Sequence, residues 1–183
     1  ASGWSVSLNS AGDRVAIGAP YNNGGGLTDS GHTRVFEWNG SSWIQLGSDI
    51  DGEAQLDASG WSVSLNAAGD RVAIGAPGNG DGGLIAGQTR IFEWNGSSWT
   101  QLGSDIDGEA AFDASGWSVS LNSAGDRVAI GALFNDGTGS TSGHTRVFEW
   151  NGSVWVQLGS DIDGEAGGDE SGRSVSINAA GDH

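Results

Sequence analysis

The sequence predicts an all-β chain of four-stranded antiparallel blades of a β-propeller, with three repeats plus the start of a fourth in an open or partial ring. First, the octapeptide of residues 13–20 returns at 70–77 and, with Leu133 replacing proline, at 126–133. Second, apolar and polar residues alternate as in half-buried strands. Third, no segment shows helical spacing. Equivalent positions are 57, 56 and 56 residues apart, at Trp4, Trp61, Trp117 and Arg173.

Each repeat is predicted to be one blade. Repeat 1 spans residues 1–57, repeat 2 spans 58–113, repeat 3 spans 114–169, and residues 170–183 form the first strand of a fourth repeat. This period is typical of a unit that cannot bury its own apolar faces and must stack on its neighbours. Because the chain lacks Met and starts and stops inside a repeat, we expect a piece of a longer or processed polypeptide.

Two strands open each repeat. Residues 4–9 alternate strictly and predict the first strand, which a turn of Gly and Asp chemistry follows. Residues 14–19 predict the second strand. The small residues Ala16 and Gly18 share one face of it, where another backbone can come close. Pro20 ends this strand because proline cannot donate to a strand ladder.

A hairpin closes each repeat. After a polar loop, residues 33–38 predict the third strand. The Asn-Gly pair at 39–40 is the strongest short hairpin signal, because both residues tolerate positive φ. Residues 43–46 predict the fourth strand. We expect Trp43 to form a cross-strand aromatic pair on the face that carries Trp38.

Such sheets carry apolar residues on both faces and need cover on each side. Blades around an axis supply that cover, which favours a β-propeller. A linear or helical stack of the same sheets would bury the faces too and stays the alternative. Three blades cannot close a ring, because propellers use about four to eight. The predicted partners are therefore further copies of the same repeat, in cis or in trans.

Composition restricts the other partners. The chain has 23 acidic and 7 basic residues and a net charge of −16. Nucleic acid is excluded as a partner, because phosphate binding needs cationic surfaces. The absence of Cys excludes disulfides and thiolate sites, and no apolar run is long enough for a membrane span. This composition suits an extracellular or cell-surface protein, where salt screens the acidic self-repulsion.

The repeat also resembles a known family. Residues 2–6 followed by 15–20 are similar to the FG-GAP repeat of integrin α-subunit propellers and of many secreted bacterial surface proteins. Residues 18–20 and 75–77 match its Gly-Ala-Pro half, residues 131–133 lack the proline, and Ser2 stands where Phe is usual. The resemblance covers nearly the full length of each repeat. It implies four-stranded blades, typically about seven to a ring, and it leaves the function open.

Members of that family often hold Ca²⁺ in the first hairpin. Here that hairpin is residues 9–13, which is too short and too poor in carboxylates to bind the ion. The family's calcium site is therefore not carried over to this position.

An acidic loop between the fourth strand and the next repeat is the candidate metal site, with Ca²⁺ as the one cofactor considered. Its carboxylates stand at relative positions 1, 3, 5 and 9, and Ca²⁺ takes six to eight oxygens at about 2.3–2.6 Å. The alternative is a solvated acidic turn whose last Asp accepts bonds from backbone N–H groups. The candidate ligands are Asp49, Asp51, Glu53, Asp57, Asp105, Asp107, Glu109, Asp113, Asp161, Asp163, Glu165 and Asp169.

The copies differ mostly in the loop after the second strand, at residues 21–30, 78–86 and 133–142. Rigid scaffolds carry binding specificity on variable loops, which makes these loops candidate ligand-binding segments. The alternative is an exposed loop that varies without a function. The candidate ligand-binding residues are Tyr21, Asn22, Asn23, Asn79, Asp81, Phe134, Asn135 and Asp136.

Other side chains have structural interpretations. The Trp residues recur at strand spacing, which favours packing over a carbohydrate platform. His32 and His144 are matched by Gln88, which argues against a ring of metal-binding histidines. Almost every acid, Ser and His belongs to a repeated set, whereas an active site is generally one constellation. The sequence therefore predicts no enzyme.

These observations favour a non-catalytic repeat module of a secreted or cell-surface protein, acting in adhesion or as a structural scaffold. One alternative is a lectin-like propeller with glycan sites on its blades. The other is the non-catalytic part of a larger extracellular enzyme. A glycan or a surface protein is the expected partner beyond copies of the repeat itself.

Overall fold

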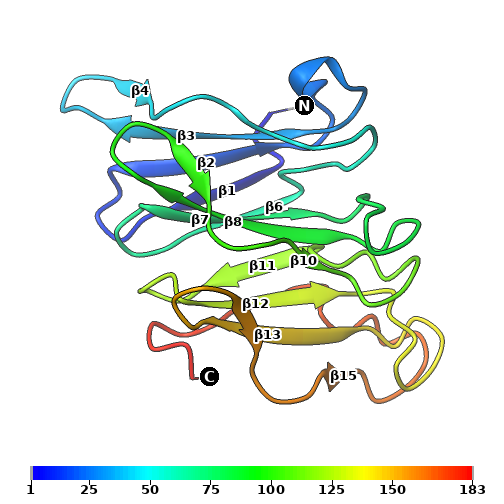
Figure 1. Cartoon of the computed structure of the whole chain (residues 1–183). Helices are drawn as coiled ribbons and strands as arrows, with labels where there is room; N and C mark the ends of the chain where they lie inside the picture. The colour runs from blue at the N-terminus through cyan, green and yellow to red at the C-terminus, as the bar shows by residue number, and fades with distance from the viewer. Residues whose placement is uncertain (1, 183) are drawn as a thin grey trace.

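The structure, a computed structural model, describes residues 2–182 as three antiparallel sheets stacked in chain order (Figure 1). Sheet 1 contains β1 (Ser5–Leu8), β2 (Arg14–Ala19), β3 (His32–Trp38), β4 (Trp43–Gln45) and β5 (Ile50–Asp51). Sheet 2 contains β6 (Ser62–Leu65), β7 (Arg71–Ala76), β8 (Gln88–Trp94), β9 (Trp99–Gln101) and β10 (Ile106–Asp107). Sheet 3 contains β11 (Ser118–Leu121), β12 (Arg127–Ala132), β13 (His144–Trp150), β14 (Trp155–Gln157) and β15 (Ile162–Asp163). None of the helical structure within residues 2–182 has the length and apolarity of a membrane span.

The four predicted strands of each repeat pair in chain order. In sheet 1 the path is β1-β2-β3-β4, and the other sheets repeat it. The predicted aromatic pair is confirmed, because Trp38 pairs with Trp43 and their ring centroids lie 5.6 Å apart. A short fifth strand was not predicted: β5 pairs with the start of β3. Two residues are too few to show an alternating pattern.

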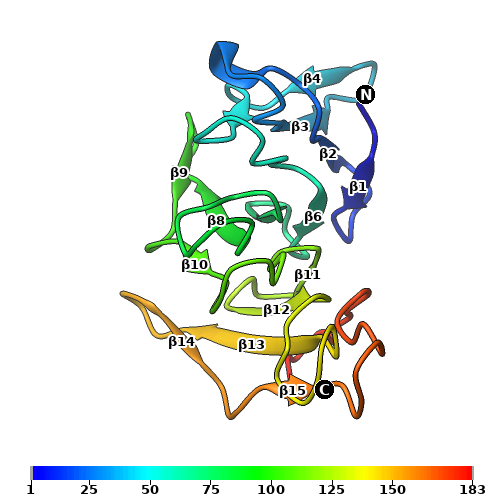
Figure 2. The same ribbon diagram turned by 90° about the vertical axis from the view of Figure 1, so that its right-hand side faces the viewer.

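The sheets fan out from their first strands. Strand β6 contacts both β1 and β11, whereas the outer hairpins end at β4, β9 and β14 (Figure 2). Serine side chains join the first strands: Val63 N–H donates to Ser5 Oγ at 3.0 Å, and Leu65 N–H donates to Ser7 Oγ at 2.9 Å. This is the blade arrangement of a β-propeller, in an open partial ring.

The apolar core lies between successive sheets. Each sheet has a backward face, which points toward the preceding repeat, and a forward face, which points toward the following repeat. The backward face of sheet 2 consists of Val63, Leu65, Val72, Ile74, Phe92 and Trp99. The forward face of sheet 1 consists of Ala16, Val35, Leu46 and Ile50. Equivalent residues of repeats 2 and 3 form the second interface.

The fourth copy differs from the prediction. Residues 173–178 form no strand, although they lie against sheet 3 as a first strand would. Ile177 N–H donates to Ser120 Oγ at 3.2 Å, as Leu65 does to Ser7. A first strand forms its ladder with the second strand of its own repeat, and the printed chain has no fourth copy of that second strand. The segment therefore keeps the stacking contact without the ladder.

The second strands carry a glycine at the point of closest approach between sheets. A Cβ atom on Gly75 would overlap the carbonyl oxygen of Gly116 in the next repeat and would crowd Ser62 Oγ. Gly18 and Gly131 stand in the same position against Gly60 and Gly172. The expectation that small residues here admit another backbone is confirmed.

We expect Gly75→Ala to lower the free energy of unfolding by about 3 kcal/mol, the upper end of the usual cost of overpacking, because a backbone carbonyl cannot move aside. Urea denaturation followed by tryptophan fluorescence measures the change. The control is Gly80→Ala, at an exposed glycine whose added Cβ would lie 3.7 Å from Gly83 O. We expect that control to change stability by less than about 1 kcal/mol. Equal effects of the two substitutions would contradict this account.

Candidate functional site

The last carboxylate of each acidic loop binds the backbone of its own loop. Asp57 Oδ2 accepts hydrogen bonds from the N–H groups of Glu53 at 3.1 Å and Ala54 at 2.7 Å. Asp113 and Asp169 accept the equivalent bonds from the N–H groups of Ala110 and Ala166. These three side chains therefore shape the turn, as the structural alternative expects.

The first carboxylate of each loop binds the preceding strand. Gln45 Nε2 donates to Asp49 Oδ1 at 2.7 Å. In the same way Gln101 donates to Asp105 and Gln157 donates to Asp161, both at 2.6 Å. One oxygen of each carboxylate is thereby occupied. The other oxygen of Asp49 lies 3.5 Å from His32 Nδ1, and that of Asp161 lies 4.0 Å from His144 Nδ1, each at the start of a third strand.

The remaining carboxylates take other directions. Asp51, Asp107 and Asp163 lie on the short fifth strands. Glu53 Oε1 lies 3.4 Å from Arg90 NH1, Glu109 Oε1 lies 3.6 Å from Arg146 NH1, and Glu165 is exposed. Within one loop the first, third and last carboxylates thus have different partners, and the calcium site stays a prediction.

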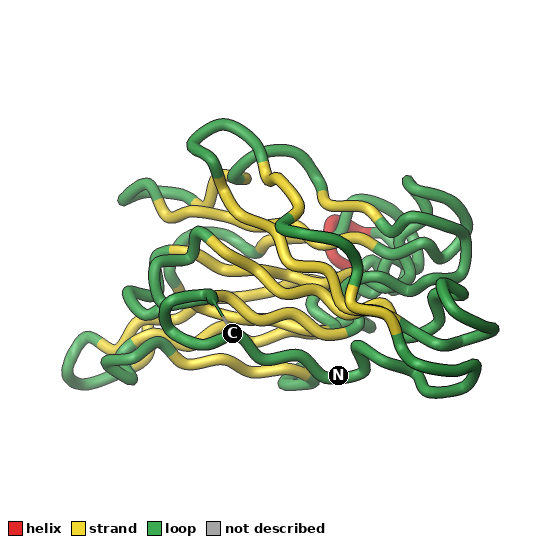
Figure 3. Tube along the Cα trace, turned by 90° about the horizontal axis from the view of Figure 1, so that it is seen from below, coloured by secondary structure: helices red, strands yellow, loops and turns green. Residues whose placement is uncertain are grey.

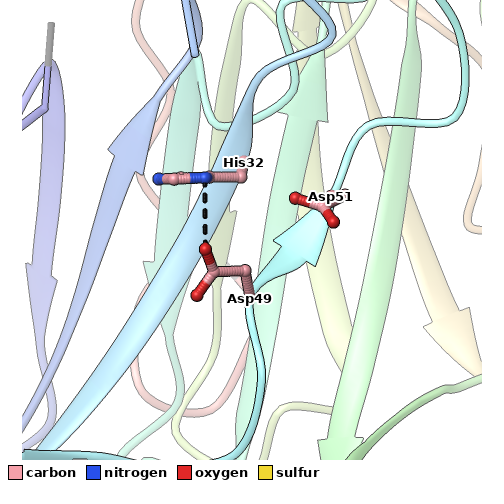
Figure 4. A group of neighbouring side chains, drawn as sticks. All are labelled: His32, Asp49 and Asp51. Carbon is pink, nitrogen blue, oxygen red and sulfur yellow. Dashed lines mark ion pairs between the residues drawn. The ribbon is translucent and has the colours of Figure 1, made fainter. Parts of the chain in front are cut away.

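Among residues 2–182, three groups of side chains do bring ligand atoms within 4.8 Å of one another. They are His32 with Asp49 and Asp51; Glu53 with Asp81 and Asp105; and Glu109 with His144 and Asp161. Figure 4 shows the first group: Asp49 lies beside the His32 ring, with Asp49 Oδ2 at 3.5 Å from His32 Nδ1. The other two groups each draw a Glu from the preceding repeat, so they lie across an interface between sheets.

Burial controls protonation in this region. The pKa of His144 lies below its usual value, chiefly because burial disfavours the imidazolium, and Arg146 adds to the effect. Burial is also the main cause that raises the pKa of the Asp107 carboxyl, and the negative charge of Asp105 acts in the same direction. Both shifts favour the neutral forms, since charged groups lose hydration when they are buried.

The variable loops lie together at one end of the strands, where η1 (Gly24–Gly26) marks the loop of repeat 1 (Figure 3). Several predicted ligand residues there hold the loop itself. Asn79 is buried and its Oδ1 accepts from Asp81 N–H, and Asn135 Nδ2 donates to Asp113 Oδ2.

The other polar candidates of these loops have local roles or lie in solvent. Asn23 Oδ1 accepts from Asp29 N–H, and Asp136 Oδ1 accepts from Thr141 N–H. Asn22 and Asp81 are exposed. Apart from Asp81, whose carboxylate lies close to those of Glu53 and Asp105, the polar candidates of these loops share no group of ligand atoms among residues 2–182.

The aromatic candidates join a row of rings at the starts of the first strands. The Trp4 and Trp61 ring centroids lie 4.8 Å apart, and those of Trp61 and Trp117 lie 4.6 Å apart. Tyr21 packs on Trp4 at 5.5 Å, and Phe134 packs on Trp117 at 6.0 Å. We call these five residues the aromatic row. The Trp side chains pack, as expected, and the row also reaches solvent, with Trp4 50% exposed and Tyr21 47% exposed.

Sequence reasoning missed the grouping of Glu109 with His144. The two residues are 35 positions apart and belong to different repeats. Two features of the sequence could have indicated this grouping. His144 is the first residue of the third strand, beside the fifth strand of its own repeat. Position 5 of the acidic loop is Glu in every copy.

Comparisons with known proteins define the fold only. No family model matches the sequence, and no curated protein matches it. Kuenenia stuttgartiensis hydrazine synthase superposes with a TM-score of 0.55 and 9% identity, over 97% of this chain and 39% of that chain. A protein described as a 6-phosphogluconolactonase from Bacteroides uniformis superposes with a TM-score of 0.58 and 11% identity, over 86% of this chain and 39% of that chain.

The third similar structure is the β-propeller domain of Cps50 (Swd1) from Myceliophteria thermophila. It superposes with a TM-score of 0.51 and 12% identity, over 84% of this chain and 37% of that chain. The chain spans about two fifths of the length of each of these three structures. At such identities the likeness shows the β-propeller fold alone, and fold does not imply function.

The structure predicts unequal effects of equivalent substitutions in the acidic loops. Asp113 is buried and also accepts from Asn135, whereas Asp169 is exposed. We expect Asp113→Ala to lower the free energy of unfolding by about 2 kcal/mol, because it leaves the buried side-chain amide of Asn135 without its acceptor. We expect Asp169→Ala to change it by less than about 1 kcal/mol. Urea denaturation with and without Ca²⁺ measures both; a large loss confined to the Ca²⁺-loaded chain would contradict the structural role.

Proposed function

We propose that this chain is a non-catalytic repeat module of a secreted or cell-surface protein, acting as a scaffold or in adhesion. Its repeats extend an assembly by stacking sheet on sheet, either on further repeats of the same polypeptide or on a second copy of the chain. The carrying observation is that apolar side chains on the two end faces are exposed where their interior equivalents are buried. Residues 173–178 cover the part of the forward face of sheet 3 against which a following first strand would lie.

Exposure separates the end faces from their buried equivalents. On the backward face of sheet 1, Val6 is 56% and Leu8 is 58% exposed, whereas the equivalent Val63 is only 7% exposed. On the forward face of sheet 3, Ile162 is 59% exposed, whereas the equivalent Ile106 is 6% exposed. Stacking one end face on the other would repeat a contact that the chain already makes twice, with β1 of the next copy taking the place that residues 173–178 occupy in the separate chain.

Polar groups at the two ends are complementary as well. At the interior interfaces, the Trp99 indole N–H donates to Leu46 O and the Trp155 indole N–H donates to Leu102 O, both at 2.8 Å. Trp43, the equivalent donor of repeat 1, has no such acceptor among residues 2–182. The equivalent acceptor of repeat 3 is the carbonyl of Leu158, a residue of the open forward face.

An arginine of the third strand repeats this pattern. Arg90 NH2 donates to Asp51 O, and Arg146 NH2 donates to Asp107 O, both at 2.7 Å. Arg34 makes no equivalent bond within residues 2–182. The matching acceptor is Asp163 O at the far end of the stack. Donors at one end thus correspond to acceptors at the other.

Charge opposes this association. Each copy carries a net charge of −16, so two copies repel each other in water of low ionic strength. Salt shortens the screening length to about 10 Å at 0.1 M, while apolar burial is almost unaffected. Association is therefore expected to strengthen as salt is added, the reverse of an interface held by ion pairs.

The non-catalytic part of the proposal is supported by repetition. Most acidic, Ser and His side chains of the chain recur at equivalent places in successive sheets. The FG-GAP resemblance supports the extracellular setting and the adhesive role, since integrin α-subunits and bacterial surface proteins carry that repeat.

The proposal is tested by measuring head-to-tail assembly of the 183-residue chain with sedimentation velocity. We expect assemblies that grow with protein concentration and with salt. Leu8→Asp disables the backward end and Ile162→Asp disables the forward end, so each variant alone is expected to stay monomeric. A mixture of the two variants retains one intact end of each kind and is expected to stop at a dimer.

Ile44→Asp is the matched control, because Ile44 is 52% exposed but belongs to neither end face. We expect this control to assemble like the parent chain. A parent chain that stays monomeric at high concentration and high salt, or a Leu8→Asp variant that still assembles alone, would refute stacking by these faces.

The aromatic row favours a second candidate, a lectin-like module. Sugar rings stack on exposed aromatic faces, and Trp4, Tyr21 and Phe134 at 39% exposure offer such faces beside the polar variable loops. The row runs across all three sheets, so a bound oligosaccharide would lie along the stack rather than within one blade.

For this candidate we expect a bound oligosaccharide to shift tryptophan fluorescence, and Tyr21→Ala to weaken binding by about tenfold through loss of one stacking ring. The control is Trp38→Ala, which removes a 41% exposed ring outside the aromatic row. Glycan-array screening followed by fluorescence titration makes the measurement. Failure to bind any sugar on a broad array would dispose of this candidate and leave the scaffold proposal intact.

A further inference from the structure

We propose that Glu109, His144 and Asp161 bind one divalent transition-metal ion of the zinc type at the interface between sheets 2 and 3. Glu109 comes from the acidic loop of repeat 2. His144 is the first residue of β13, and Asp161 stands just before β15 in repeat 3. The proposal is independent of the head-to-tail assembly, because the isolated chain contains all three residues.

The three ligand atoms face one another. His144 Nδ1 lies 3.9 Å from Glu109 Oε2 and 4.0 Å from Asp161 Oδ2. A tetrahedral zinc ion with bonds of about 2.0–2.1 Å holds its ligand atoms about 3.3–3.4 Å apart. The distances to His144 exceed this by about half an ångström, and all three ligand atoms lie within 4.8 Å of one another. Glu109, whose side chain is 42% exposed, is free to move closer. Water completes the coordination from the solvent side.

The state of His144 points to a ligand. Its side chain is 1% exposed, and neither Nδ1 nor Nε2 has a hydrogen-bond partner among the described residues. A buried polar group without a partner is unfavourable by about 1–3 kcal/mol. A metal ion on Nδ1 would satisfy one of the two nitrogens. Burial lowers the pKa of His144, which favours the neutral form of imidazole that binds metals.

The charges around the site permit a cation. Two carboxylates face the histidine, and one positive group, Arg146, lies nearby. Arg146 NH1 approaches Oε1 of Glu109, so the other oxygen of that carboxylate stays directed at His144. Asp113 adds further negative charge near the ring. An imidazole nitrogen with carboxylates suits zinc better than Ca²⁺, which prefers oxygen ligands alone.

The other repeats provide internal comparisons. In repeat 2 the equivalent residues are Glu53, Gln88 and Asp105, so an amide replaces the imidazole. In repeat 1, His32 lies beside Asp49, but no preceding repeat of the chain supplies a Glu. Repeat 3 is therefore the place where a Glu, a His and an Asp of this pattern all meet.

The test uses a variant in which the other histidines are substituted, so that His144 carries its one imidazole. The chain has three histidines, so the background variant is H32Q/H183Q. Calorimetric titration with ZnCl₂ in excess CaCl₂, which occupies unspecific carboxylates, is expected to show one zinc ion per chain. Adding H144Q is expected to weaken binding at least about tenfold, since even outer-sphere changes reach that size.

Gln88 offers the reciprocal experiment. In the variant H32Q/H144Q/H183Q, which has no histidine, Q88H places an imidazole between Glu53 and Asp105. We expect this substitution to restore one zinc site. Zinc should also raise the melting temperature of the background variant, but not that of its H144Q derivative, because the ion joins two sheets.

Two outcomes would overturn the proposal: no zinc binding by H32Q/H183Q, or binding that neither H144Q nor E109Q weakens. If H144Q does not fold, E109Q decides alone, because the partly exposed Glu109 side chain tolerates the change. Circular dichroism establishes that each variant used is folded.

Discussion

The close contact between the second strand of one repeat and the backbone of the next is the constraint on which the structure depends. Gly18, Gly75 and Gly131 each face a carbonyl oxygen of the following repeat at a distance that leaves no room for a side chain. At this separation Ser5 and Ser7 reach the N–H groups of β6, and Val63 and Leu65 become buried. Each such apolar side chain is worth about 1.5–3 kcal/mol when fully buried, against about 1 kcal/mol for a hydrogen bond. Apolar burial therefore provides most of the stability, and the serine bonds fix the register.

Strand positions could be predicted because each strand carries a local signal. The alternation of β1, the small face of β2 and the Asn-Gly turn before β4 all act within a few residues, and each was found where expected. Strand β5 has two residues and no pattern of its own; its pairing depends on the position of β3. Residues 173–178 have the alternating pattern of a first strand, but a segment with this pattern forms a ladder only if its partner strand is present. The pattern of a first strand therefore predicts a strand only when the second strand with which it forms its ladder is also present in the sequence.

The candidate site was harder to predict because its members belong to different repeats. Spacing within the acidic loop suggested that Asp49, Asp51, Glu53 and Asp57 act together, but spacing says nothing about direction. Asp57 turns back to its own loop, and Glu53 crosses to Arg90 of the next sheet. That crossing follows from stacking, which no local pattern encodes. The aromatic row was partly predictable, since the Trp positions recur, although their contact with Tyr21 depends on a loop that varies.

Sites that lie between repeats tie ligand binding to assembly. A Glu from one sheet and a His with an Asp from the next are brought together only when the two sheets stack, so an end sheet holds half of such a site. His32 and Asp49 form the half at one end, and Glu165, exposed at the other end, is the equivalent of Glu109. In a head-to-tail stack, Glu165 of a preceding copy would lie beside His32 as Glu109 lies beside His144. A cation bound there would stabilise the stacked state and not the separate chains, by an amount that rises with its concentration. The same contact that buries Val63 in the interior would then make metal binding and chain assembly mutually reinforcing.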